Sequence, residues 1–230
     1  MHLYGGELTD EVLHQLIDAA KDGFGSHMTD DDARNHILGA ETLHIIRYDN
    51  ELVGFGAYTT FRVLGLKVLY LGGIVLKEEN QGLHLFDVSM ERALRDEDPE
   101  LLVMRTQNPV VYHCASRYVS AIYPNASRSV SRQATYERAL AIAVGTVVAE
   151  RLKTKSYDPE TFACRNTYGR PLNDKIPEIR DSGATRVFDE LKIDRQRGDS
   201  VLIVGFVKGV YQKNAAEKQS TASMADAGGK

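Results

Sequence analysis

The stretch YLGGIVLKEENQGLHLF, residues 70–86, has the residue types and spacing that can hold an anion. An apolar run ends at Leu76, a short polar turn containing Gly82 follows, and apolar residues then recur at helical spacing. Free N–H groups and a partial positive charge at a helix N-terminus attract phosphate, and glycine lets the backbone approach it closely. The sequence therefore predicts a phosphate site formed by a strand, a turn and a helix.

Other patterns predict the elements that position this turn. Two helices are expected to begin at the capping residues Thr9 and Thr29, each followed by acidic residues. Apolar runs predict strands within residues 42–48, 52–63, 68–76, 101–106 and 198–209. Further helices are expected over residues 83–95, 108–123, 134–153 and 186–193. This order predicts a mixed α+β fold, with a mostly antiparallel central sheet, at least one parallel crossover and flanking helices.

Composition limits the class of protein. Of the 230 residues, 43% are hydrophobic and 26% are charged, which is ordinary for a globular protein, and the net charge of −4 does not favour a nucleic-acid surface. Cys114 and Cys164 form no CxxC motif, so neither a disulfide framework nor a metal site is expected. Two cysteines of this kind fit a protein of the reducing cytoplasm, which is the expected location. The N-terminus lacks a signal-peptide core, and no apolar run is long enough to cross a membrane.

A change in character near Pro124 divides the chain. We expect a single domain over residues 1–211, in which residues 125–195 form an insertion before the last strand. The small and polar residues 212–230 are expected to form a disordered tail.

The element order, together with Gln81, Gly82, Asn108 and Tyr118, resembles the GNAT superfamily of acyl-coenzyme A-dependent N-acyltransferases. The resemblance covers roughly residues 1–124 and the strand near 200–208. In that family a pattern close to Q/R-x-x-G-x-G/A follows the fourth strand, and its backbone amides hold the coenzyme A pyrophosphate. Here the family's Gln/Arg position matches Gln81, and its two small-residue positions hold His84 and Phe86. In a second register Gly82 takes the first glycine position, and Glu79 then replaces the Gln/Arg.

The resemblance implies acetyl-coenzyme A as co-substrate and assigns its binding residues. The end of the fourth strand would pair with the pantetheine arm, through Gly73, Ile74, Val75 and Leu76. The turn would hold the pyrophosphate, through Gln81, Gly82, Leu83, His84 and Leu85. Asn108 would contact the pantetheine arm, cap the next helix, or do both.

The resemblance also implies a catalytic acid and an acceptor. Tyr118 precedes Tyr123 by the five residues that separate two aromatic positions in the family, and would protonate the departing thiolate. The acceptor would be an amine, on a small molecule or on a protein. No residue stands out as the general base, and Glu41 and Glu51 are expected to be structural.

Several roles stay open at this point. Tyr157, Tyr168 and Arg170 could line the acceptor site or simply pack, and the helix over 134–153 could be core or a homodimer face. Two further functions compete with the acyltransferase: a non-catalytic binding or structural protein of the same fold, with its coenzyme pocket closed by His84 and Phe86, and an unrelated α+β enzyme.

Overall fold

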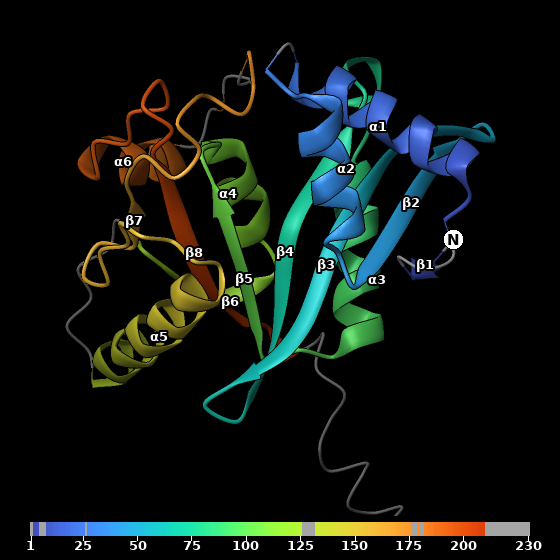
Figure 1. The fold of residues 1–230 in the computed structure, drawn as a ribbon. Helices are drawn as coiled ribbons and strands as arrows, with labels where there is room; N and C mark the ends of the chain where they lie inside the picture. Colours follow the sequence, from blue (N-terminus) through green and yellow to red (C-terminus); the bar gives the residue numbers. More distant parts are fainter. Residues whose placement is uncertain are drawn as a thin grey trace, which may run out of the picture.

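The structure is a computed structural model that describes residues 2–4, 8–25, 27–125, 132–175, 179 and 182–209 (Figure 1). The predicted tail over residues 212–230 and the stretch 126–131 lie outside this range. The helices are α1 (Asp10–Phe24), α2 (Asp30–Leu38), α3 (Leu85–Glu97), α4 (Pro109–Ser116), α5 (Arg132–Arg151) and α6 (Ser182–Glu190). The strands are β1 (His2–Tyr4), β2 (Thr42–Tyr48), β3 (Glu51–Val63), β4 (Leu66–Leu76), β5 (Leu101–Thr106), β6 (Val119–Tyr123), β7 (Ala163–Cys164) and β8 (Ser200–Val207).

The strands form one mixed sheet in the order β1-β2-β3-β4-β5-β8-β6, and β7 pairs with β8. Within the described residues β4 and β5 are the parallel pair, joined through α3, and the other pairs are antiparallel. The predicted mixed α+β class, with a mostly antiparallel sheet and one parallel crossover, is confirmed.

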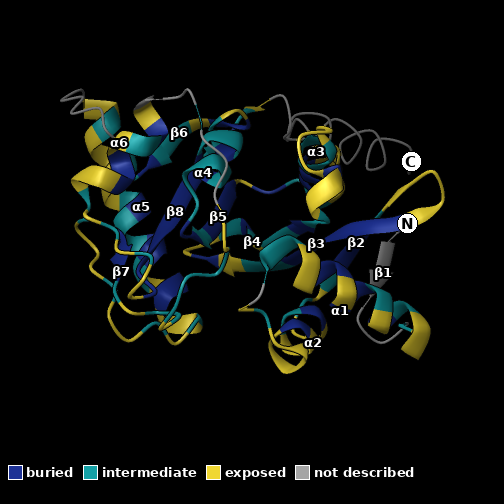
Figure 2. Ribbon diagram, turned by 90° about the horizontal axis from the view of Figure 1, so that it is seen from above, coloured by how far each residue is buried: buried dark blue, intermediate teal, exposed yellow. Residues whose placement is uncertain are grey.

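Helices cover both faces of the sheet (Figure 2). On one face, α3, α4 and α6 bury a core against alternate strand residues such as Leu69, Leu71 and Met104. On the other face, α1 and α2 pack on β2, β3 and β4, and α5 packs on β3, β5 and β8. The two helices predicted at the N-terminus begin as expected, because Thr9 and Thr29 accept hydrogen bonds from Val12 N and Asp32 N.

The central feature of the sheet is the point where β4 and β5 separate. Their parallel pairing runs from Val68↔Leu101 to Leu71↔Met104 and then stops. A shift in the β3–β4 register leaves Gly72 out of the pairing, because Tyr58 faces Leu71 and Ala57 faces Gly73. Such a bulge bends the strand, so the end of β4 pairs with β3 alone.

The single helix predicted over residues 108–123 is wrong in its second half. The helix α4 ends at Ser116, and residues 119–123 form β6, which pairs with β8. The sequence VSAIY suits either state, and pairing with the edge of β8 decides it. Asn108 caps α4 and Pro109 occupies its first turn, as predicted.

The predicted insertion contains α5, β7 and α6. The helix α5 belongs to the core, since Ala141, Val144 and Val148 are fully buried, while Tyr136 and Val147 are exposed. The homodimer stays a prediction, as do the domain limits. None of the helices in the described residues is long and apolar enough to cross a membrane.

Candidate functional site

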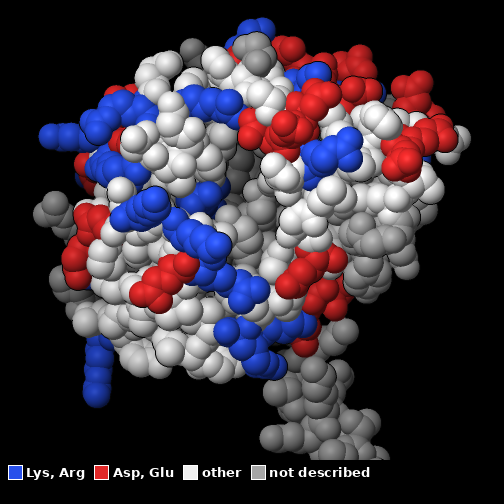
Figure 3. Space-filling view, viewed as in Figure 1, with Lys and Arg blue, Asp and Glu red and all other residues white. Residues whose placement is uncertain are grey.

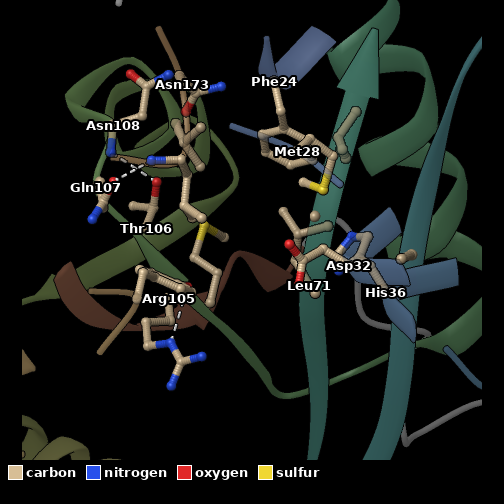
Figure 4. A pocket seen from close by; sticks show the side chains of 18 of the residues that line it. Phe24, Met28, Asp32, His36, Leu71, Arg105, Thr106, Gln107, Asn108 and Asn173 are labelled. Carbon is tan, nitrogen blue, oxygen red and sulfur yellow. Dashed lines mark hydrogen bonds between the residues drawn. The ribbon is translucent and has the colours of Figure 1, made fainter. Parts of the chain in front are cut away.

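A cavity of about 560 Å³ opens where β4 and β5 separate, and its volume is that of a small-molecule site. The walls are formed by the ends of β4 and β5, Ala57 and Thr59 of β3, the α1–α2 region, the first residues of α3 and α4, and the loop 167–173. The molecule is hollowed at this place in Figure 3, beside a run of basic side chains. Figure 4 shows side chains from β5 and α4 on one wall and from α1 and α2 on the wall that faces it.

The turn predicted to hold phosphate has a conformation suited to that task. Gly82 has φ +84°, which favours glycine, and a Cβ there would meet open space. Among the described residues, no protein acceptor takes a hydrogen bond from the backbone N–H groups of residues 82–86. These donors precede or begin α3, where the helix dipole adds positive charge. The turn therefore offers free donors to an anion.

The side chains around this turn leave it open. Gln81 is turned back to the strand, because its Nε2 donates to Leu76 O at 3.2 Å. His84 has φ +58°, is largely exposed, and directs its Nδ1 to Asp87 at 3.2 Å. Phe86 lines the cavity wall with Ile74. The non-catalytic alternative requires the imidazole of His84 to close the cavity. The exposed imidazole does not do so.

The strand residues predicted to contact the pantetheine arm lie at the edge of the cavity. Gly73, Ile74, Val75 and Leu76 pair with β3, and no strand pairs with them on the side that faces β5. Gly73 and Ile74 line the cavity, and Val75 is buried against α1. Strand edges of this kind supply unpaired N–H and C=O groups to an extended ligand.

At the start of α4, Asn108 lines the cavity and its Oδ1 accepts a hydrogen bond from Val110 N at 2.8 Å. The preceding Gln107 is buried and was not predicted to matter. Its Nε2 donates to Arg170 O at 3.2 Å, and its Oε1 accepts from Leu172 N at 2.8 Å. Gln107 therefore holds the loop 167–173 over the cavity.

Tyr118 lies away from these residues, between α4 and β6. It is 3% exposed, and its Oη donates to Asp87 Oδ1 at 2.5 Å. The same carboxylate accepts from Arg117 at 2.7 Å and from His84 at 3.2 Å. Burial and the hydrogen bond to Asp87 raise the pKa of Tyr118, so the phenol keeps its proton at neutral pH. Tyr118 thus shares Asp87 with His84 and packs in the same core as Leu71 and Met104 of the cavity wall, but it does not itself line the cavity.

Sequence reasoning missed His36, which faces the cavity from α2. Its Nε2 is buried and has no hydrogen-bond partner among the residues that the structure describes. Burial lowers the pKa of the imidazole, so the ring is neutral at pH 7 and can accept a proton. A histidine inside the polar segment DDDARNHIL gives no local signal of this role, because only the fold brings α2 over β4.

The remaining charged groups on the cavity wall are Asp32, Arg105 and Arg170. Arg170 forms an ion pair with Asp32, and the hydrogen bond from Arg170 lowers the pKa of that carboxyl. Arg105 donates from Nε to Tyr168 Oη at 3.0 Å and from Nη1 to Thr154 Oγ1 at 2.8 Å. Tyr168 and Arg170 thus line the cavity, whereas Tyr157 packs against Phe162 in the core.

The described residues contain no cluster of His, Cys, Asp and Glu suited to a metal ion. Neither cysteine lines the cavity, and burial raises the pKa of both thiols. The cavity therefore offers hydrogen-bond donors, a neutral imidazole and a guanidinium to a ligand, and it offers no nucleophilic thiol.

No family model matches this chain, and no curated protein matches it. Among solved structures, the chain is similar to GCN5 from Tetrahymena, with 8% identity over 86% of this chain and 88% of that one and a TM-score of 0.42. It is similar to the ribosomal-protein-S18-alanine N-acetyltransferase of Escherichia coli, with 12% identity over 90% and 94% of the two chains and a TM-score of 0.40.

A third similar structure is an acetyltransferase of the GNAT family from Bacillus cereus, with 16% identity over 56% of this chain and 89% of that one and a TM-score of 0.39. Other matches span as little as 31% of the solved chain. The resemblance to GNAT proteins stays a prediction made from the sequence.

Proposed function

We propose that this protein is an N-acyltransferase that moves an acetyl group from acetyl-coenzyme A to an amine. One observation carries the proposal: the free N–H groups of residues 82–86 stand at the start of α3, and α3 begins at the wall of the cavity between β4 and β5. The N–H groups can donate hydrogen bonds to a diphosphate. The strand edge and the cavity beside them can hold an extended ligand and its acyl group.

The proposed reaction is direct acyl transfer in this cavity. The amine nitrogen attacks the thioester carbonyl, the C–N bond forms, the C–S bond breaks, and the thiolate leaves with the electron pair of that bond. Backbone N–H groups at the unpaired edge of β4 are the proposed donors to the developing oxyanion. Because the amine must lose a proton, His36 is the proposed acceptor, through its unpartnered Nε2.

Tyr118 stays the sequence-based prediction for the acid that protonates the thiolate. Its phenol is protonated at pH 7, as an acid must be, but the raised pKa makes it a weaker proton donor while it binds Asp87. The structure adds a condition, because the hydroxyl must leave Asp87 to reach a thiolate in the cavity. Until it does, the same hydroxyl ties the connection between α4 and β6 to α3.

Isothermal titration of the protein with acetyl-coenzyme A tests the proposal directly. Micromolar binding, followed by release of free thiol when amines are added, is the expected result. No heat at millimolar ligand would refute it and would leave the non-catalytic alternative. The cytoplasmic location stays a prediction that fits this co-substrate.

A further inference from the structure

The net charge of the side chains that line the cavity indicates which kind of substrate it can bind. The acidic and basic side chains that line it are Asp32, His36, Arg105 and Arg170. Asp32 and Arg170 neutralise each other in an ion pair, and His36 is neutral because burial lowers the pKa of its imidazole. The cavity therefore carries one net positive charge, which belongs to Arg105.

Arg105 is held in place without a counter-ion. It follows Met104, the last residue of β5 paired with β4, so it stands where the two strands part. Its guanidinium carbon lies 4.8 Å from the centroid of the Tyr168 ring, and the hydrogen bonds to Tyr168 and Thr154 use Nε and Nη1. Within the described part of the chain, no carboxylate pairs with Arg105, and Nη2 makes no hydrogen bond.

This arrangement is costly unless an anion completes it. A half-buried guanidinium loses hydration, and neutral hydroxyl partners return less energy than a carboxylate does. An arginine whose rotamer is already fixed loses little entropy when it binds a ligand. A planar guanidinium also matches a carboxylate in geometry, and one net positive charge balances a single carboxylate rather than a doubly charged phosphate.

We propose that the cavity binds a substrate carboxylate at Arg105. The inference rests on the proposed function and narrows its substrates. The carboxylate can belong to the acceptor, which is then an amino acid, or to the acyl group, which is then a dicarboxylic half-thioester such as succinyl-coenzyme A. The recognising chemistry is the same in both cases.

Matched substrates separate the two sources. Each of the twenty common amino acids is compared with its own primary amide, using acetyl-coenzyme A and release of free thiol as the readout. In the second arm, succinyl- and malonyl-coenzyme A replace acetyl-coenzyme A. We expect the carboxylate-bearing member to be favoured at least tenfold in kcat/KM in one of the two arms, as hydrogen bonds to a charged group suggest.

The variant Arg105→Met removes the charge and keeps a side chain of similar length. We expect it to abolish the preference by lowering kcat/KM for the carboxylate substrate alone. Arg151→Met is the matched control, because Arg151 also lies over an aromatic ring, that of Phe61, but does not line the cavity. A wild-type protein that turns over both members of every pair equally would overturn the inference, as would an Arg105→Met variant that keeps the preference.

A binding measurement separates this inference from the proposed function. The thermal midpoint of the free protein is followed with succinate, with glutamate and with succinamide as an uncharged probe. If no acyl-coenzyme A binds but the two carboxylates raise the midpoint in the wild type and not in Arg105→Met, the proposed function fails and the carboxylate site stands. If coenzyme binds and neither turnover nor midpoint depends on a carboxylate, the inference fails alone.

Discussion

The imidazole of His36 lies directly against Gly73, so that a Cβ on Gly73 would stand 2.9 Å from His36 Nε2 and 3.1 Å from its Cε1. The pair joins α2 to β4 at the point where β4 loses its parallel partner. A glycine at this position gives the ring room beside the strand edge, next to the proposed path of the thioester. Several experiments follow from this contact and from the turn before α3.

Gly73→Ala is expected to move the His36 ring and to lower activity at least tenfold. The cost to stability should stay near 1 kcal/mol, because the atom that must shift is the end of a side chain and not backbone. Kinetics and denaturant unfolding measure the two effects. In a double-mutant cycle with His36→Asn, the second substitution should add little, and full additivity would show that the contact has no functional role.

His36→Asn is expected to lower kcat by about 10²-fold or more, the usual share of a general base. In the wild type, activity should rise with pH as the imidazole loses its proton. Because burial lowers the pKa of His36, the midpoint of this rise should lie below pH 6.5.

The charged groups that share the cavity wall with this ring are Asp32 on α2, Arg170 on the loop and Arg105 on β5. The variant should lack the rise, and His14→Asn, an exposed histidine of α1, should keep it. An unchanged pH profile in His36→Asn would assign the proton to another acceptor.

Leu83→Glu places a negative charge in the turn that offers its N–H groups to a diphosphate. Affinity for coenzyme A should fall about tenfold or more, because like charges repel in a shared site. Leu83 is 47% exposed, so the fold should not suffer. Leu64→Glu is the matched control, since Leu64 is 64% exposed in the β3–β4 turn and lies outside the cavity. Equal affinity in both variants would remove the turn from coenzyme binding.

Tyr118→Phe removes one donor from Asp87 and is expected to lower the free energy of unfolding by about 1.5–3 kcal/mol. If Tyr118 is also the acid, kcat falls far more than the affinity for acetyl-coenzyme A. Unfolding curves and steady-state kinetics on the folded variant measure both quantities. A folded variant with unchanged kcat would leave Tyr118 as a structural anchor alone.

Because of Asp87, the free energy of unfolding should depend on pH in the acidic range. Burial alone would raise its pKa, but hydrogen bonds from Tyr118 and His84 and the charge of Arg117 outweigh burial and lower it. A lowered pKa in the folded state means that this contribution is complete above about pH 5 and is lost as pH falls through the folded value. Asp87→Asn should therefore flatten the stability curve below pH 5, and a curve parallel to the wild type would contradict the assignment.

The local patterns of the sequence determined most of the secondary structure. Thr9, Thr29 and Asn108 carry their own capping oxygens, and the apolar runs of β3 and β4 match buried strands, so these elements follow from nearest neighbours. The turn around Gly82 was predictable for the same reason, because its backbone geometry depends on residues only a few positions apart.

Tertiary structure alone decided the state of residues 119–123 and the make-up of the cavity. Residues 119–123 became a strand because β8, some eighty residues later, offers an edge. His36, Arg105, Gln107 and Tyr168 come from three separate segments, and their environments depend on burial and on partners that no local pattern encodes. The neutral state of the His36 imidazole and the half-buried position of the Arg105 guanidinium depend on the groups around them. Only the folded chain brings those groups together.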